Sequence, residues 1–339
     1  MKQAEREPQG PRFIFRPPLQ SLSSAKICDM TIPGEEIALY QAFILEVAKE
    51  LGAMQCPPDK MLWHYTNGAA LISILNSNEI YSTQISCLND STELKYGSRL
   101  FHTALNDLRT ETGNDELSKK LLDGATRHFE ENLGYSPASF HFVSCFSEEK
   151  DDLSQWRAYG GGENGYAIGF LAADLCGIPN SMLVRVNYDS ELHQALAKKA
   201  AMEMVRFFKE AVQKYRPTDL VQFGQDFLEA WEKQIVMIAP MVKDPGFFKE
   251  KEYRIAKGYT ASDLESLQFK QRVTMMSRHL PLQPQGWVRS EPYRLPISEI
   301  MVGPCRHPEI SRTSVGTLLQ QKRYPPDRLS ISKIPFQIT

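Results

Sequence analysis

Apolar positions along this chain recur with two periods, one typical of helices and one typical of short strands, and the two alternate from residue 33 onward. Ile37, Tyr40, Ile44, Val47 and Leu51 recur at helical spacing and predict an amphipathic helix that Gly52 ends. Further helices are expected from Asn67 as N-cap, from about residue 90 through 105, over 115–133 and over 310–321, with two long ones within 190–242. Short apolar runs predict strands at 61–66, 80–83, 140–147, 165–170, 182–188, 252–258, 297–302 and 329–334.

This interleaving of short strands with helix pairs predicts an α+β core with a helical insertion rather than a regular doubly wound sheet. Residues 1–30 combine proline with polar residues and show no periodicity, so we expect a flexible tail. We expect residues 31–56 to form an N-terminal helix and linker. Residues 57–339 are then a single α+β domain, with the helical insertion at about 190–242.

Composition narrows the class of protein. The 339 residues are 42% hydrophobic and 24% charged, which is typical of a globular protein. The formal net charge of −2 disfavours a hydrolase that acts on nucleic acid. No apolar run is long enough to span a membrane or to serve as a signal sequence, and the six cysteines form no CxxC pair. We therefore expect a cytoplasmic protein with no metal site and no membrane partner.

The strand at 61–66 carries the first candidate residues. His64 and Thr66 are two positions apart, so they share one side of that strand. One interpretation places them in a cleft at the strand end. The alternative is a core histidine whose ring is satisfied by a main-chain carbonyl.

The run from Lys249 to Arg254 carries the second candidates. Glu250, Glu252 and Arg254 fall on one face if a strand begins here. Adjacent carboxylates raise one another's pKa and the guanidinium lowers both, which indicates a tuned acidic site. A solvated charge run entering an edge strand is the alternative.

A third group follows the strand at 140–147 and ends in the glycine loop 160–162. The arginine, the glycines and a ring face suit a ligand with a pyrophosphate and a base, although the loop matches neither a P-loop nor a dinucleotide-binding turn. In that interpretation Arg157 and one ring reach the same cleft as His64; in the alternative Trp156 is a core anchor and Arg157 pairs with Asp151 or Asp152. The candidate residues are Ser147, Trp156, Arg157 and Tyr159.

Two further local patterns have competing interpretations. Cys145 is conceivable as a nucleophile with His64, but thiols inside apolar strands are usually inert. Asp90 followed by Glu93 predicts a capping box at a helix start. The alternative places Asn89 and Glu93 at the mouth of the cleft.

Several segments together resemble the bacterial domain-of-unknown-function family 2971 (DUF2971), from about Leu62 to the carboxyl terminus. The segments that carry the resemblance are HYT, LNDSTE, FVSCFSEEKDDLSQWRAYG, GYAIGF, VNY, FFKEKEYRI and EIMVGP. The family name itself implies no activity.

The order of His-x-Thr on a first strand, Ser at the end of a middle strand and Glu-x-Glu opening a late strand also resembles the ADP-ribosyltransferase superfamily. This resemblance implies a split β core and NAD as substrate. It assigns His64 to the NAD ribose, Ser147 to the middle position and Glu252 to the transition state, with Glu250 as an extra carboxylate. The aromatic residue expected on the middle strand is absent, so Phe146, Trp156 or Tyr159 must replace it.

The leading hypothesis from these residues is an enzyme that cleaves NAD and transfers ADP-ribose to a protein or nucleic-acid acceptor. The resemblance also implies a toxin or phage-defence setting and a regulatory protein partner. The alternative is a non-catalytic module that senses a nucleotide or a partner protein through the cleft near Trp156 and Arg157.

Overall fold

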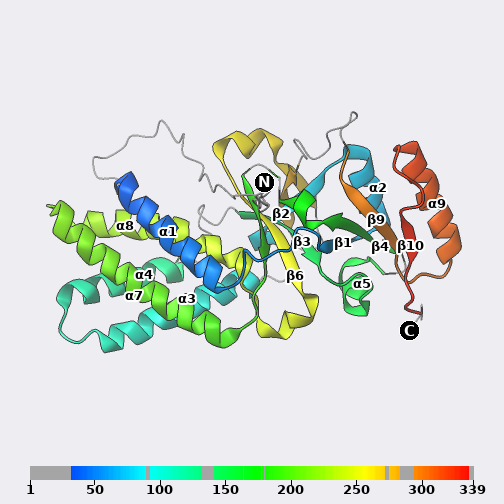
Figure 1. Cartoon of the computed structure of the whole chain (residues 1–339). Coiled ribbons are helices and arrows are strands. Elements are labelled where there is room, and N and C mark those ends of the chain that lie inside the picture. Colours follow the sequence, from blue (N-terminus) through cyan, green and yellow to red (C-terminus); the bar gives the residue numbers. More distant parts are fainter. Residues whose placement is uncertain are drawn as a thin grey trace, which may run out of the picture.

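In the computed structural model, the chain has a mixed α+β fold with a 10-stranded, mostly antiparallel sheet (Figure 1). The structure describes residues 32–88, 92–131, 141–162, 164–176, 178, 180–271, 275–282 and 294–335. The strands are β1 (Met61–Asn67), β2 (Ile80–Gln84), β3 (His141–Ser147), β4 (Gly165–Leu171), β5 (Ser181–Arg185), β6 (Glu252–Gly258), β7 (Gln268–Gln271), β8 (Met276–Leu282), β9 (Ile297–Val302) and β10 (Leu329–Ile331). Their order is β10-β9-β4-β1-β3-β2-β8-β7, and β6 pairs with both β3 and β5.

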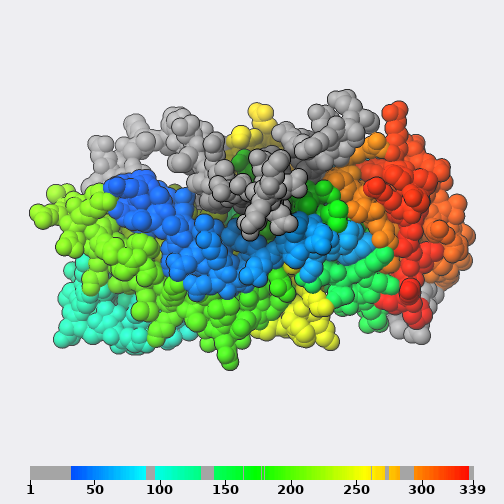
Figure 2. All heavy atoms as spheres, viewed as in Figure 1, coloured from blue at the N-terminus to red at the C-terminus, as the bar shows by residue number. Residues whose placement is uncertain are grey.

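Five helices form a layer at one end of the molecule, and the α9 and β10 end lies opposite (Figures 1 and 2). These are α1 (Gly34–Glu50), α3 (Thr92–Glu111), α4 (Glu116–Glu131), α7 (Ser190–Tyr215) and α8 (Leu220–Ile235). Asp189 and Asp219 cap α7 and α8, so the two long helices expected within 190–242 are confirmed. The layer has its own aromatic core, in which Tyr40 of α1 packs against Trp231 of α8. The N-terminal helix is thus part of this layer.

Shorter helices pack elsewhere on the sheet. They are α2 (Gly68–Ser77), α5 (Leu153–Tyr159), α6 (Ala172–Leu175) and α9 (Pro308–Gln321), with 3-10 turns η1 (Ile85–Cys87), η3 (Val236–Met241), η4 (Pro245–Glu250) and η5 (Ala261–Ser266). The apolar sides of α2, α6 and α9 join one core cluster with Phe146 and Ile168. Asn67 caps α2 as expected, since its side chain accepts a hydrogen bond from the N–H of Ala70 at 2.9 Å.

Strand β3 is the centre of the arrangement that matters for the site. Its residue Ser147 pairs with Trp63 of β1 and Val143 pairs with Thr83 of β2, while β6 pairs along the whole strand. Because β6 occupies one edge of β3, β1 and β2 must both lie along the other edge, at its two ends. The sheet is therefore split beside β3, between β1 and β2.

The observed elements differ from the expected ones in a few places. Strand β5 ends at Arg185 rather than at 188, because Asn187 turns away from β6 and bridges to Val242 after η3. Strands β7 and β8 were not predicted; β7 is exposed at all four positions and has no apolar run. None of the helices in the described ranges is long and apolar enough to span a membrane.

Candidate functional site

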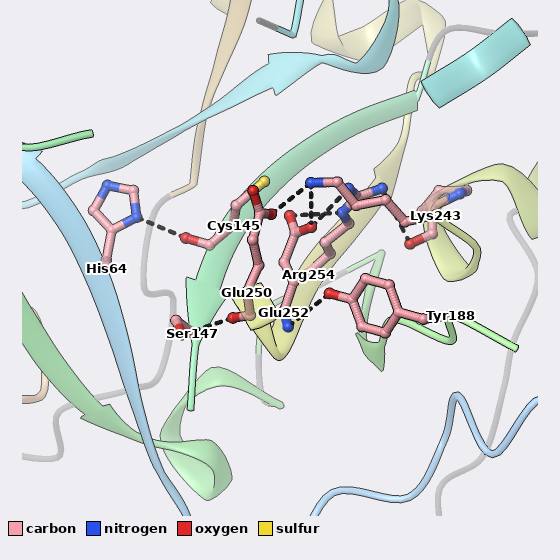
Figure 3. Close-up of polar contacts among 9 residues, drawn as sticks. His64, Cys145, Ser147, Tyr188, Lys243, Glu250, Glu252 and Arg254 are labelled. Carbon is pink, nitrogen blue, oxygen red and sulfur yellow. Dashed lines mark hydrogen bonds and ion pairs between the residues drawn. The ribbon is translucent and has the colours of Figure 1, made fainter. Parts of the chain in front are cut away.

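Four charged side chains meet where the sheet joins the helical layer (Figure 3). Glu252 accepts two hydrogen bonds from Arg254, both at 2.8 Å. The ammonium nitrogen of Lys243 lies 3.1 Å from Oε2 of Glu252 and 2.6 Å from Oε2 of Glu250. Lys243, Glu252 and Arg254 are buried, and Arg254 is 0% exposed. The four charges sum to zero, as buried ionised groups require.

Strand register and two 3-10 turns position this cluster. In the β3–β6 pair, Cys145 lies opposite Arg254 and Ser147 lies opposite Glu252, so these four side chains point to the same face of the sheet. Lys243 follows η3, and Glu250 is the last residue of η4. Lys251 then adopts a left-handed conformation, φ 43°, which turns the chain into β6.

The surroundings of Glu252 keep its carboxylate ionised. Burial by itself would raise the pKa of Glu252, but Arg254 and then Lys243 lower it to about 2. The neighbouring Cys145 thiol lowers this pKa as well. A carboxylate offers about four acceptor positions, and Arg254 and Lys243 together occupy three of them.

Ser147 and Tyr188 hold the main chain around the carboxylates. The Ser147 hydroxyl donates to the carbonyl oxygen of Glu250 at 2.8 Å and accepts from the N–H of Glu149 at 3.1 Å. The Tyr188 hydroxyl accepts a hydrogen bond from the N–H of Glu252 at 3.0 Å. Both side chains therefore position the main chain at the start of β6, and their hydroxyl groups are used in these hydrogen bonds.

His64 lies at the split in the sheet and outside the charged cluster. Its Nδ1 donates to the carbonyl oxygen of Cys145 at 2.9 Å, and its ring contacts Phe146 with centroids 5.5 Å apart. Phe146 points to the face opposite Cys145 and Ser147, so the backbone of β3 separates the imidazole from Glu252. Burial lowers the pKa of His64 and the bond to Cys145 partly offsets it, which favours the neutral ring. Thr66, also on β1, is buried.

Trp156 is a core anchor. It is buried, its Nε1 donates to Asp151 at 2.8 Å, and its ring packs edge-on against Tyr65. The glycine loop serves this packing: a Cβ on Gly160 would stand 2.6 Å from the Trp156 carbonyl oxygen, and one on Gly161 would stand 2.8 Å from the Cβ of Asn67.

Arg157 and Tyr159 lie on the exposed sides of α5. Neither Asp151 nor Asp152 forms an ion pair with Arg157, since Asp151 accepts from Trp156 and Asp152 caps α5. The structure therefore does not show the alternative in which Arg157 pairs with one of these two aspartates. Burial, and then the negative charge of the Glu250 carboxylate, raise the pKa of the Tyr159 hydroxyl. Tyr159 therefore borders the charged cluster.

Some expected features cannot be placed and one residue was not anticipated. Asn89 and Asp90 lie outside the described residues, as does the side chain of Glu93. Lys243 was not predicted as a site residue, because it follows a 3-10 turn and carries no motif. Its sequence signal is its position directly after the apolar stretch 237–242. In the described ranges, no cluster of His, Cys, Asp or Glu side chains could hold a metal ion.

Comparison with known proteins gives one match. Residues 155–255 match the family described as Protein of unknown function (DUF2971). The DUF2971 match begins within α5 and ends within β6. It includes β4, β5, α7 and α8, and also Lys243, Glu250, Glu252 and Arg254. The match covers less than a third of the chain. It is shorter than the segment over which the sequence resembles this family, from about Leu62 to the carboxyl terminus. No curated protein and no solved structure matches the chain.

Proposed function

We propose that this protein cleaves NAD and transfers the ADP-ribosyl group to a macromolecular acceptor, with Glu252 as the carboxylate that stabilises the transition state. The observation that carries the proposal is the buried, ionised Glu252 at the start of β6, with Glu250 joined to it through Lys243. The proposal also draws on the split of the sheet beside β3, where His64 donates to the Cys145 carbonyl, and on the split core that the ADP-ribosyltransferase resemblance implies.

In this reaction the bond between the nicotinamide nitrogen and the anomeric carbon breaks, and the electron pair leaves with nicotinamide. Positive charge then develops on the anomeric carbon and its ring oxygen, and a fixed carboxylate stabilises it because that carboxylate is already oriented. An acceptor nucleophile bonds to the anomeric carbon and gives up its proton. Glu250, less buried than Glu252, is placed to receive that proton.

The side chains around Glu252 set a condition on this proposal. Arg254 and Lys243 leave one acceptor position of the carboxylate for a ribose hydroxyl, and the neighbouring Cys145 thiol is only half-buried. We therefore expect Cys145→Ala, which opens space at that position, to lower the KM for NAD several-fold while kcat changes little. Cys145→Ser, which keeps a side chain of similar size, is the matched control and retains the wild-type KM.

Nicotinamide release from NAD, with and without cell extract, tests the function directly. We expect release by the wild type and at least a hundredfold slower release by Glu252→Gln. The double variant Glu252→Gln/Arg254→Met removes one charge of each sign, so it separates lost chemistry from lost folding. Wild-type activity in that double variant would exclude Glu252 from the reaction.

A non-catalytic nucleotide-sensing module is the second candidate. The contacts of Glu252 favour it, since a carboxylate paired with Arg254 and Lys243 can hold the chain around a binding site without taking part in any chemistry. Calorimetry with NAD distinguishes the two candidates: heat of binding without nicotinamide release supports the sensing module.

A further inference from the structure

Lys243 is the buried cation that touches both carboxylates of the site. Its ammonium nitrogen is 2.6 Å from Glu250 and 3.1 Å from Glu252, and only 3% of its surface is exposed. The ring of Phe247 lies 4.9 Å from the same nitrogen and covers it. The ammonium group is fixed in this position, because moving it away from the two carboxylates would leave a positive charge buried apart from them, which is unfavourable.

The helical layer sets the position of Lys243. The two preceding residues, Met241 and Val242, are buried in the core of that layer. The N–H of Lys243 donates to the carbonyl oxygen of Asn187, and the N–H of Asn187 donates to the carbonyl oxygen of Met241. The side chain of Asn187 in turn donates to the carbonyl oxygen of Leu51, at the end of α1. Packing of the helices therefore determines where the ammonium group stands.

Two neighbouring carboxylates repel each other, and without a cation between them one retains its proton. The other titratable and charged groups that face this pair are Arg254 of β6, Cys145 of β3, Tyr159 of α5 and Tyr188 after β5. Both tyrosines are uncharged at neutral pH, as an ordinary phenol is, and burial raises the pKa of their hydroxyls further. Arg254 makes bidentate contacts with Glu252, and Lys243 contacts both carboxylates.

We propose that Lys243 is the positioning residue of this site: it holds Glu250 and Glu252 together in the ionised state, and it transmits the packing of the helical layer to them. Its role in catalysis rests on the proposed transfer from NAD. Its effect on the protonation of Glu250 and Glu252 does not depend on that transfer and is measured by titration.

The test compares Lys243→Met with Lys243→Arg, which keeps the charge, and with Lys251→Met as a matched control. Lys251 lies in the same segment but is 52% exposed in its side chain and pairs with Glu149 at the surface. The carboxyl carbons of ¹³C-glutamate are titrated by NMR, and Glu250→Gln and Glu252→Gln assign the two signals. The pH profile of kcat for nicotinamide release is recorded for each variant.

In Lys243→Met we expect one of the two glutamates to titrate at least one pH unit higher, a tenfold change in proton affinity. The acidic limb of the kcat profile moves by the same amount. Lys243→Arg and Lys251→Met titrate as the wild type does. Unchanged titration of both glutamates in folded Lys243→Met overturns the proposal.

If Lys243→Met does not fold, Lys243→Gln, which keeps a polar side chain at this position, carries the same measurement, and we expect the same rise in the titration of one glutamate. A shifted titration in a protein that releases no nicotinamide would refute the proposed function alone. Lys243 would then hold the carboxylates of a binding site.

Discussion

Replacing Glu252 by Gln removes the carboxylate that pairs with the fully buried Arg254 and one of the two carboxylates that contact Lys243. Against the effect of burial, Arg254 and Lys243 lower the pKa of Glu252 to about 2 from its ordinary value of 4.5. A depressed acidic pKa stabilises the fold above the unfolded pKa, and that stability is lost as the pH falls toward the folded pKa. A shift of this size corresponds to about 3 kcal/mol at pH 7 and about 2 kcal/mol at pH 3.5. Removal of one partner of a buried ion pair typically costs about 3–5 kcal/mol, which agrees.

Urea denaturation followed by tryptophan fluorescence measures this loss. We expect Glu252→Gln to lower the free energy of unfolding by about 3 kcal/mol at pH 7, with a smaller difference at pH 3.5. Glu149→Gln, which breaks the exposed pair with Lys251, is the matched control and costs less than about 1 kcal/mol. The double variant Glu252→Gln/Arg254→Met recovers much of the loss, because no buried charge is stranded at Arg254. Equal stability of Glu252→Gln and wild type, or no recovery in the double variant, would refute this account.

Three other predictions concern the residues around the site. Gly161→Ala should lower the melting temperature more than Gly162→Ala, since both positions have positive φ but only at Gly161 would a Cβ collide with Asn67. Burial lowers the pKa of His141 to about 4, so on acidification the imidazole binds a proton in the unfolded chain before it does so in the folded protein. The free energy of unfolding therefore falls by up to about 3 kcal/mol as the pH drops from 6.5 to 4. In urea titrations at several pH values, His141→Phe should abolish this fall. Trp156→Phe should cost about 1 kcal/mol through the lost hydrogen bond to Asp151, and an unchanged unfolding midpoint would show that this bond contributes nothing.

Periodicity was sufficient for elements that bury a regular apolar face. The helices α1, α7 and α8 and the strands β1, β3 and β6 appear where their spacing predicts them. The pattern failed for β7, whose exposed residues have no buried face to mark them. It also could not show that α1 would join α7 and α8, because partners in tertiary packing leave no local signal.

The candidate site shows the same division between local and long-range information. Two-residue spacing was enough to place Glu252 and Arg254 on one face of a strand. It did not indicate that β3 would stand between His64 and these groups, since that depends on which edge β1 occupies. Lys243 enters the site through the return of the chain from the helical layer, and no spacing within the sequence encodes that return.

The pairing of β3 with β6 has a consequence for how the protein is made. The Ser147 hydroxyl and the Glu250 carbonyl are joined across 103 residues of chain. During synthesis, the edge of β3 that pairs with β6 therefore has no hydrogen-bond partner from β6 until the segments that form α7 and α8 have been made. Closing so long a loop costs conformational entropy. Early packing of α7 and α8 reduces this cost, because it brings the two ends of the loop together. A nascent or truncated chain that stops before η4 holds His64 and Ser147 but neither Glu250 nor Glu252, so the charged site forms only late in translation.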